Sequence, residues 1–230
     1  MLEQKLYRID LSRSKNLLIL MPGAGNRHTS FEDHGFIHSA TDSGLSADIL
    51  TVDTSYEQFS DLSIEKRLHE EVVLPARLAG YERIWMGGIS LGSFGTMVYA
   101  RKNANMLAGL VLIAPYLGNR GTLAEIRSAG GLDAWNPDIA DDYDERHVWK
   151  IIKNYPTAFT PNLPLFLLYG NDDRFVEFHQ LLATRLKPET ITTVSGGHDW
   201  PIWQALWQHF IKDGPLSASS RFSSLGRYQS

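Results

Sequence analysis

The pentapeptide Gly88-Ile89-Ser90-Leu91-Gly92 decides the expected fold because of what stands on either side of it. A short apolar run precedes it, and Leu91–Arg101, rich in small residues, follows it with the character of a helix. A serine on a sharp strand-to-helix turn has strained backbone angles, so glycines two residues before and after it avoid clashes with neighbouring chain. Gly88 and Gly92 meet this need. The pattern predicts a nucleophile elbow that projects the Ser90 hydroxyl out of a sheet.

Short apolar or β-branched runs recur along the whole chain, with longer helical patterns between them. None alternates cleanly with polar residues, which is typical of strands covered on both faces, and the helical stretches supply the crossovers that parallel strands need. The predicted fold class is therefore α/β, with a mostly parallel central sheet and helices on both faces. The predicted strands are Asn16–Met21, Asp48–Val52, Arg83–Met86, Gly109–Ala114, Pro164–Tyr169 and Thr190–Val194.

Two further helical patterns have features that predict where they begin or end. The stretch Ile64–Arg77 contains Pro75, which should kink or end a helix. The last helix begins at Trp200, with Asp199 placed to cap it and its tryptophans at helical spacing on one face. We expect most of those tryptophans to lie in the core.

The domain organisation follows from length and composition. With 230 residues, 43% hydrophobic and 21% charged, the chain fits one packed domain over residues 1–214. Residues 117–160 fall outside the alternation of strands and helices, so we expect a small cap inserted between two strands. Trp135 and Trp149 in this insertion are candidates for lining a substrate pocket, or they anchor the cap to the domain. The Ser-rich residues 215–230 are expected to form a flexible tail.

Charge and composition exclude several classes of function. The net charge is −4 and Lys and Arg are scattered, so nucleic acid is not an expected partner. There is no cysteine, which excludes a Cys nucleophile and thiolate metal sites. No stretch approaches the roughly 20 apolar residues of a membrane span. The apolar run after the basic start ends at Pro22, too short for a signal peptide, so a cytoplasmic location is expected.

A serine hydroxyl needs a base to take its proton, and the base needs a carboxylate to fix its tautomer. Of the eight histidines, His198 alone falls between the last predicted strand and the last helix, on a glycine loop. His28 is a second candidate because it follows the first glycine loop. The acid should follow another strand, and Asp172 and Asp173 compete for that place after Pro164–Tyr169. Ligands bind at the carboxyl ends of strands in such sheets, where Ser90, Asp173 and His198 fall.

Four segments together resemble the α/β-hydrolase superfamily over roughly residues 5 to 212, with the small bacterial esterase-like members the most similar. They are the loop Met21-Pro22-Gly23-Ala24-Gly25, the elbow around Ser90, the Gly-x-x-Asp segment ending at Asp173, and Gly-Gly-His-Asp-Trp around His198.

The resemblance implies a triad of Ser90, Asp173 and His198 in this chain order. It favours Asp173 as the acid, because similar hydrolases place that residue three positions after a glycine, and Asp172 is then free to cap the next helix. It also implies an oxyanion hole made by the backbone N–H groups of Leu91 and Ala24. Pro22-Gly23 stands where relatives usually carry His-Gly, which is a departure from the family pattern.

The expected chemistry is an acyl-Ser90 intermediate resolved by water, so that the protein cleaves a small-molecule carboxylic ester or thioester without any cofactor. Transfer of the acyl group to another nucleophile is the alternative within catalysis. A third possibility is a relative of the fold that has lost catalysis and serves as a binding module.

Two other enzyme classes fit the sequence poorly. The segment Gly23–His28 begins like a dinucleotide fingerprint, with Asp48 or Asp53 as a ribose partner, but His28 stands where the third glycine is needed. No His-Glu-x-x-His or comparable cluster suggests a metal hydrolase.

Overall fold

A central sheet organises the computed structural model, which describes residues 1–9, 14–54, 58, 63–142, 144–159 and 163–218. Among these residues, seven strands pair in the order β1-β3-β2-β4-β5-β6-β7, and only β1 runs antiparallel to its neighbour. The predicted α/β class with a mostly parallel sheet is confirmed. The strands are β1 (Gln4–Tyr7), β2 (Asn16–Met21), β3 (Asp48–Val52), β4 (Arg83–Ile89), β5 (Gly109–Ile113), β6 (Leu165–Gly170) and β7 (Ile191–Val194).

The central strands are buried on both faces, which explains their continuous apolar sequences. In β5 every residue is buried, and in β2 only Asn16 retains partial exposure. Strand β4 runs to Ile89, further than the expected Met86, because Gly87 and Gly88 continue the pairing with β5. A Cβ atom on Gly87 would lie 2.6 Å from the carbonyl oxygen of Val111, so close strand contact explains this glycine.

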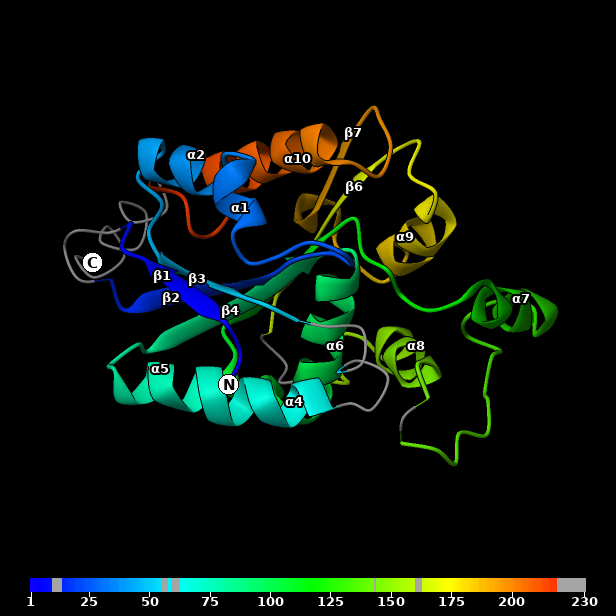
Figure 1. The fold of residues 1–230 in the computed structure, drawn as a ribbon. Helices are drawn as coiled ribbons and strands as arrows, with labels where there is room; N and C mark the ends of the chain where they lie inside the picture. The colour runs from blue at the N-terminus through cyan, green and yellow to red at the C-terminus, as the bar shows by residue number, and fades with distance from the viewer. Residues whose placement is uncertain (10–13, 55–57, 59–62, 143, 160–162, 219–230) are drawn as a thin grey trace, which may run out of the picture.

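Helices cover both faces of the sheet (Figure 1). Two buried clusters lie between them and the sheet, one on each face. On one face lie α1 (Ser30–Asp33), α2 (Phe36–Asp42) and α10 (Trp200–Asp213). On the other face lie α4 (Ser63–Leu68), α5 (Leu74–Leu78), α6 (Leu91–Asn103), α7 (Arg120–Ser128), α8 (Arg146–Lys153) and α9 (Val176–Ala183).

The helix that contains Pro75 does not end at the proline, which was one of the two expected outcomes. A π-helical turn, His69–Val73, separates α4 from α5, and Pro75 lies in the first turn of α5. The three segments form one continuous helical run over residues 63–78, and the π-helical turn lies directly before the proline. The change of helical geometry therefore precedes the proline.

The insertion at residues 117–160 shares the core of the sheet, as far as it is described. Apolar side chains of α7 and α8 belong to the same buried cluster as β2 and α6. Residue 160, at the expected end of the insertion, lies outside the described residues. Within the described part of the chain, no helix is long and apolar enough to cross a membrane.

The packed region extends beyond residue 214, where the tail was expected to begin. Leu216 and Ser217 are buried, and the carbonyl oxygen of Leu216 accepts a hydrogen bond of 2.8 Å from the Ser46 N–H. The chain is therefore anchored against the domain up to this point. The expected flexibility of residues 219–230 concerns a segment outside the described residues.

Candidate active site

The elbow at Ser90 joins β4 directly to α6. Ser90 has φ 51° and ψ −111°, a left-handed conformation that side chains rarely adopt and that often marks functional sites. Its N–H donates to the carbonyl oxygen of Ile113 over 2.9 Å, so the neighbouring strand holds the strained residue in place. A Cβ atom on Gly92 would lie 2.1 Å from the Met21 carbonyl oxygen, and one on Gly88 would lie 2.4 Å from the Gly92 carbonyl carbon. Only glycine fits at these two positions.

The structure brings Ser90, His198 and Asp173 into one hydrogen-bonded row. The His198 Nε2 atom lies 3.0 Å from the Ser90 Oγ atom, and the His198 Nδ1 atom lies 2.7 Å from the Asp173 Oδ2 atom. An ionised carboxylate only accepts, so Nδ1 carries the ring proton and Nε2 presents its lone pair to the serine hydroxyl. In this arrangement Ser90 donates its O–H to the ring, as a general base requires.

The carboxylate of Asp173 is fixed where β6 ends and has no exposed side-chain surface. Its Oδ1 atom accepts from the Phe175 N–H over 2.8 Å, while Oδ2 faces His198. Burial by itself would raise the pKa of Asp173, but the hydrogen bonds from His198 and Phe175 outweigh it and hold this pKa below the usual value. Asp173 therefore stays ionised at neutral pH and can orient the imidazole.

The loop that carries His198 lies tightly against the loop that carries Asp173. A Cβ atom on Gly170 would lie 2.2 Å from the Gly196 carbonyl oxygen, and Gly196 itself has φ 133°. The expectation that Asp172 caps the next helix is wrong: its Oδ2 atom accepts from the Gly196 N–H over 3.1 Å, and α9 begins later, at Val176. Asp172 thus ties the two loops together from outside the row.

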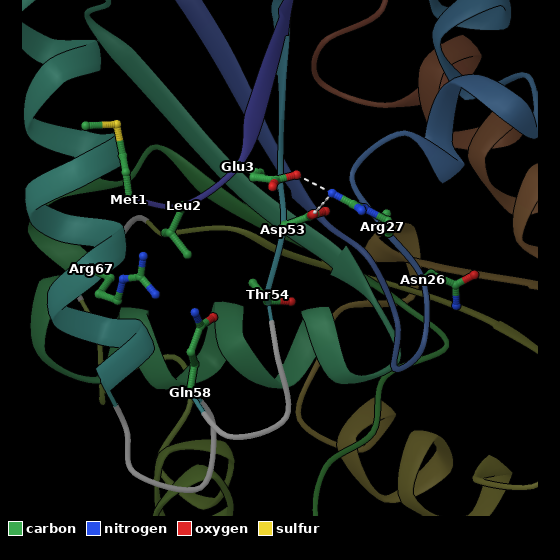
Figure 2. A pocket seen from close by; sticks show the side chains of 9 residues that line it. All are labelled: Met1, Leu2, Glu3, Asn26, Arg27, Asp53, Thr54, Gln58 and Arg67. Atoms are coloured by element: carbon green, nitrogen blue, oxygen red, sulfur yellow. Dashed lines mark hydrogen bonds and ion pairs between the residues drawn. The ribbon is translucent and has the colours of Figure 1, made fainter.

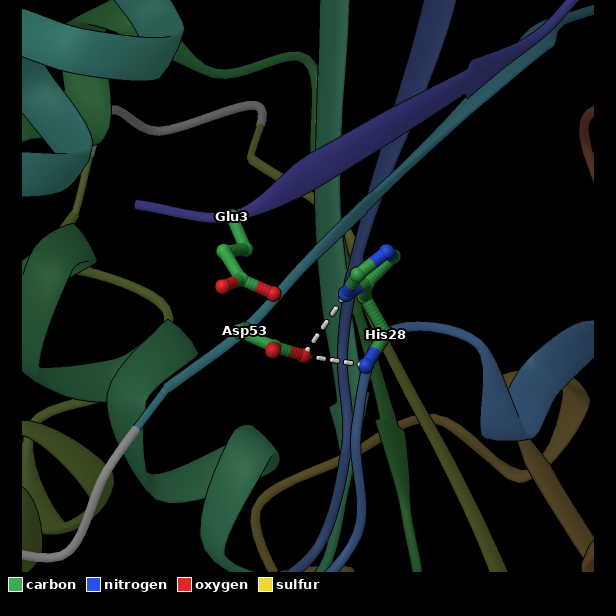
Figure 3. Close-up of side chains that lie close together, drawn as sticks. All are labelled: Glu3, His28 and Asp53. Atoms are coloured by element: carbon green, nitrogen blue, oxygen red, sulfur yellow. Dashed lines mark hydrogen bonds and ion pairs between the residues drawn. The ribbon is translucent and has the colours of Figure 1, made fainter. Parts of the chain in front are cut away.

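His28, the second candidate for the base, lies away from the row. Its Nδ1 atom is 3.0 Å from the Asp53 Oδ1 atom, and Glu3 lies beside them (Figure 3). These three side chains have the composition of a metal site, but the Arg27 guanidinium pairs with Glu3 and, over 3.3 Å, with Asp53 (Figure 2). A permanent cation already pairs with both carboxylates of the cluster, so we assign it no metal.

The first loop passes directly over the elbow. A Cβ atom on Gly23 would lie 3.4 Å from the Ser90 Cβ atom. Asn26 donates its N–H to the Gly23 carbonyl oxygen over 3.1 Å, and Gly25 has φ 76°, so residues 23–26 form a tight turn that includes Ala24. On the other side of Ser90, Leu91 is the first residue of α6, and its N–H has no acceptor within the helix. Both backbone segments implied for an oxyanion hole flank the serine.

A row of aromatic rings beside the serine escaped the sequence analysis. Tyr116 donates its N–H to the Ser90 carbonyl oxygen over 3.1 Å, and its ring contacts Phe94 and Phe175 at centroid distances of 5.8 and 5.7 Å. Phe175 continues the row to the His198 ring at 5.2 Å. Tyr116 and Phe175 follow the ends of β5 and β6, so the rule that ligands bind at the carboxyl edge of the sheet could have identified them.

A second histidine is buried near the acid. His179 has no exposed surface, donates from Nε2 to the Pro115 carbonyl oxygen over 2.9 Å, and has no hydrogen-bond partner at Nδ1 among the described residues. Burial lowers the pKa of His179 to about 4, against a smaller opposing effect of the Pro115 hydrogen bond and the Asp173 charge. His179 is therefore neutral at physiological pH.

Trp135 and Trp149 have the burial expected of anchors. Trp149 is fully buried and Trp135 is 3% exposed. The Trp149 Nε1–H donates to the Leu117 carbonyl oxygen over 2.6 Å, and its ring packs against Phe178 at 5.9 Å. These contacts hold α8 against the domain, which favours the anchoring interpretation over the lining of a substrate pocket.

Comparisons with known proteins identify the fold. No family model and no curated protein sequence matches the chain. Among solved structures, an S-formylglutathione hydrolase from Agrobacterium tumefaciens has a TM-score of 0.62 at 13% identity, covering 92% of this chain and 88% of that chain. Est1E from Butyrivibrio proteoclasticus has a TM-score of 0.60 at 17% identity, covering 92% and 94%. A monoacylglycerol lipase from Paleococcus ferrophilus has a TM-score of 0.54 at 13% identity, covering 99% and 98%. The expected α/β-hydrolase fold is confirmed, and at these identities only the fold follows.

Proposed function

We propose that this protein of α/β-hydrolase fold is a serine hydrolase that cleaves carboxylic esters or thioesters through an acyl-Ser90 intermediate. The observation that carries the proposal is the row in which His198 lies 3.0 Å from the Ser90 hydroxyl and 2.7 Å from the Asp173 carboxylate. A serine, a base and an orienting acid joined in this way are the parts that nucleophilic catalysis needs.

In the first half of the reaction, the Ser90 Oγ atom attacks the carbonyl carbon while His198 Nε2 takes its proton. The carbonyl oxygen becomes an oxyanion, and the buried charge of Asp173 stabilises the imidazolium that forms. His198 then gives the proton to the departing alcohol or thiol as the tetrahedral intermediate collapses to the acyl-serine.

In the second half, a water molecule gives a proton to His198 Nε2 and attacks the acyl carbon. Collapse of that intermediate releases the carboxylic acid and returns the proton to the Ser90 oxygen. In both halves we assign the stabilisation of the oxyanion to the N–H groups of Leu91 and Ala24, which flank the serine, and to the positive end of α6.

The surroundings of Ser90 support an apolar acyl group. The rings of Phe94, Tyr116 and Phe175 form one continuous contact series beside the serine and the His198 ring. Tyr116 is held by its O–H donating to Glu145 over 3.1 Å, so the 117–160 insertion helps to fix this wall. The named activities of similar structures, on S-formylglutathione and on monoacylglycerol, include both a thioester and an ester.

Graded p-nitrophenyl esters and acyl thioesters, given to the wild-type protein and to Ser90→Ala, test this function. We expect turnover by the wild type and a loss of several orders of magnitude in Ser90→Ala, because only the oxyanion hole and substrate binding remain. Ser39→Ala, which removes a helix serine on α2 from its hydrogen bond to Gly35, serves as the matched control and should stay active. Ser90→Ala activity within a few-fold of wild type would contradict the proposal.

Two further outcomes separate the alternatives. If added alcohol or hydroxylamine captures most of the acyl group in preference to water, the same acyl-serine serves acyl transfer. If the folded wild-type protein neither turns over any substrate nor forms a covalent adduct at Ser90 with a fluorophosphonate probe, the protein is a binding module.

A further inference from the structure

One side chain, Asn26, connects the loop over Ser90 with the helix that follows His198. The Asn26 Nδ2 atom donates to the Ala24 carbonyl oxygen over 3.2 Å. The Asn26 Oδ1 atom accepts from the Trp200 Nε1–H over 3.3 Å. Trp200 is the first residue of α10, two positions after His198. Two segments separated by more than half of the chain therefore meet at a single amide group.

The turn that Asn26 closes has two available forms. Its hydrogen bond from the Asn26 N–H to the Gly23 carbonyl oxygen and its Gly25 at φ 76° define a type II turn, in which the third position requires a positive φ. A type I turn differs mainly by a flip of the central peptide, which would reverse the directions of the Ala24 carbonyl and the Gly25 N–H. Because the Asn26 amide holds the Ala24 carbonyl, it selects one of these two orientations.

Trp200 in turn selects the orientation of the Asn26 amide. An indole N–H only donates, so it faces Oδ1 and leaves the two protons of Nδ2 for the Ala24 carbonyl. The indole itself is held between rings: it stacks on His34 at 4.1 Å with 9° between planes, and it contacts Trp203 edge-on at 5.1 Å. Trp200 is thus a fixed donor, and the orientation of the turn is set by packing on α10.

We propose that Asn26 is a positioning residue that holds the Ala24 backbone in place for oxyanion stabilisation, and that Trp200 fixes Asn26. The Ala24 N–H belongs to the peptide before the one that flips, so Asn26 acts on it through the backbone angles of Ala24, which join the two peptides. The inference rests on the proposed function, since it needs the Ala24 N–H to face the reacting carbonyl. Donors that are already oriented stabilise developing charge without reorganisation during the reaction. Neither side chain contacts the reacting atoms, and both act through the peptide groups of the turn.

Kinetic constants of Asn26→Ala and Trp200→Phe on one activated ester test the proposal. Outright loss of an oxyanion-hole donor lowers kcat by about 10²–10³-fold in a well-studied protease, so a misplaced donor should cost roughly tenfold or more. We expect kcat to fall by that factor in Asn26→Ala, with KM within about twofold. Activity should fall at low pH because a protonated His198 cannot accept the Ser90 proton. The pH at which it falls should be the same in Asn26→Ala as in the wild type, because the hydrogen bonds of His198 are intact.

Trp200→Phe keeps a ring for packing and removes only the donor, so it should lower kcat in the same direction by a smaller factor. The double variant should be no slower than Asn26→Ala, because residues that act through one contact are not additive. Two matched controls lose an equivalent hydrogen bond away from the turn: Asn16→Ala, whose amide donates to the Ser46 carbonyl over 2.7 Å, and Trp207→Phe, whose indole donates to the Phe36 carbonyl over 3.0 Å. Both should keep the wild-type kcat.

A wild-type kcat in folded Asn26→Ala, or a change confined to KM, would overturn the positioning role. So would independent, multiplicative effects of the two substitutions. Absence of turnover in the wild-type protein would instead be a failure of the proposed function, so the two failures are distinguishable.

Discussion

Two aspartates are fully buried at opposite ends of parallel strands, and they differ in what their partners can do. Asp48 begins β3 and accepts from the Arg8 guanidinium over 3.0 Å, the Tyr81 O–H over 2.7 Å and the Ile9 N–H over 3.0 Å. Asp173 follows β6 and accepts from the Phe175 N–H over 2.8 Å and from His198 over 2.7 Å. Neither side chain has any exposed surface.

The comparison shows that burial of a carboxylate does not by itself identify a reactive site. Arginine stays protonated, and burial together with the hydrogen bond to Asp48 raises the pKa of Tyr81 to about 12, so no proton moves around Asp48 at neutral pH. The partner of Asp173 is an imidazole whose other nitrogen faces a serine hydroxyl. The Asp48 network therefore stabilises the fold, and the Asp173 row can transfer a proton.

The largest effects are expected when each aspartate is replaced by asparagine, which should separate the catalytic role of Asp173 from the stabilising role of Asp48. Asp173→Asn should lower kcat by about 10⁴-fold with little change in thermal stability, because an amide favours the wrong tautomer of the imidazole. Asp48→Asn should lower the free energy of unfolding by about 1–3 kcal/mol, since donors that faced a carboxylate lose an acceptor, with kcat of the folded protein unchanged. Calorimetry and steady-state kinetics on both variants measure the pair.

The same experiment can contradict this interpretation. If Asp48→Asn inactivates the folded protein, or if Asp173→Asn keeps activity within tenfold of wild type, then the hydrogen-bond partners of the two aspartates do not determine their roles.

Acid should lower the free energy of unfolding through His179, which is buried near Asp173. The unfolded chain binds a proton at this histidine below about pH 6.5, whereas the folded protein, whose His179 pKa is lowered to about 4, resists protonation. The unfolded state binds more protons between these limits, so the free energy of unfolding falls as pH falls through this window, by up to about 3 kcal/mol. Denaturant titrations from pH 7 to 4 give the free energy of unfolding at each pH. This free energy should fall less steeply with pH in His179→Gln than in the wild type, and an equally steep fall would contradict the assignment.

The smallest effect is expected at Asp172, next to the acid. Its carboxylate contacts only the Gly196 N–H among the bonds described, and an asparagine oxygen can accept the same bond. Asp172→Asn should therefore change kcat/KM by less than about threefold, since an exposed hydrogen bond contributes on the order of 1 kcal/mol or less. The neighbouring Asp173→Asn is the control, and a stronger defect at Asp172 than at Asp173 would reverse the assignment of the acid.

Local sequence predicted most of the sheet and the elbow because these features depend on neighbouring residues. Apolar runs indicated β2 to β7, and the spacing of Gly88 and Gly92 indicated the turn at Ser90. Strand β1 was missed because its residues at the edge of the sheet are mostly exposed and carry no apolar pattern.

Features that depend on distant contacts could not be predicted in this way. Asn26 meets Trp200 across 174 residues, and nothing near either residue in the sequence indicates the contact. Asp172 was expected to cap a helix because local rules favour that role, but the crossing of the loops after β6 and β7 brought the Gly196 N–H to it instead. The positions of Ser90, Asp173 and His198 after predicted strands placed them at the carboxyl edge of the sheet, but not in contact with one another.

The most direct test of the central claim is to map the adduct of a fluorophosphonate probe by mass spectrometry in the wild-type protein and in Ser90→Ala. A hydroxyl activated by His198 attacks phosphorus and displaces fluoride, so the account predicts one stoichiometric adduct on Ser90 and none in folded Ser90→Ala. An adduct on another residue, or equal labelling of Ser90→Ala, would contradict it.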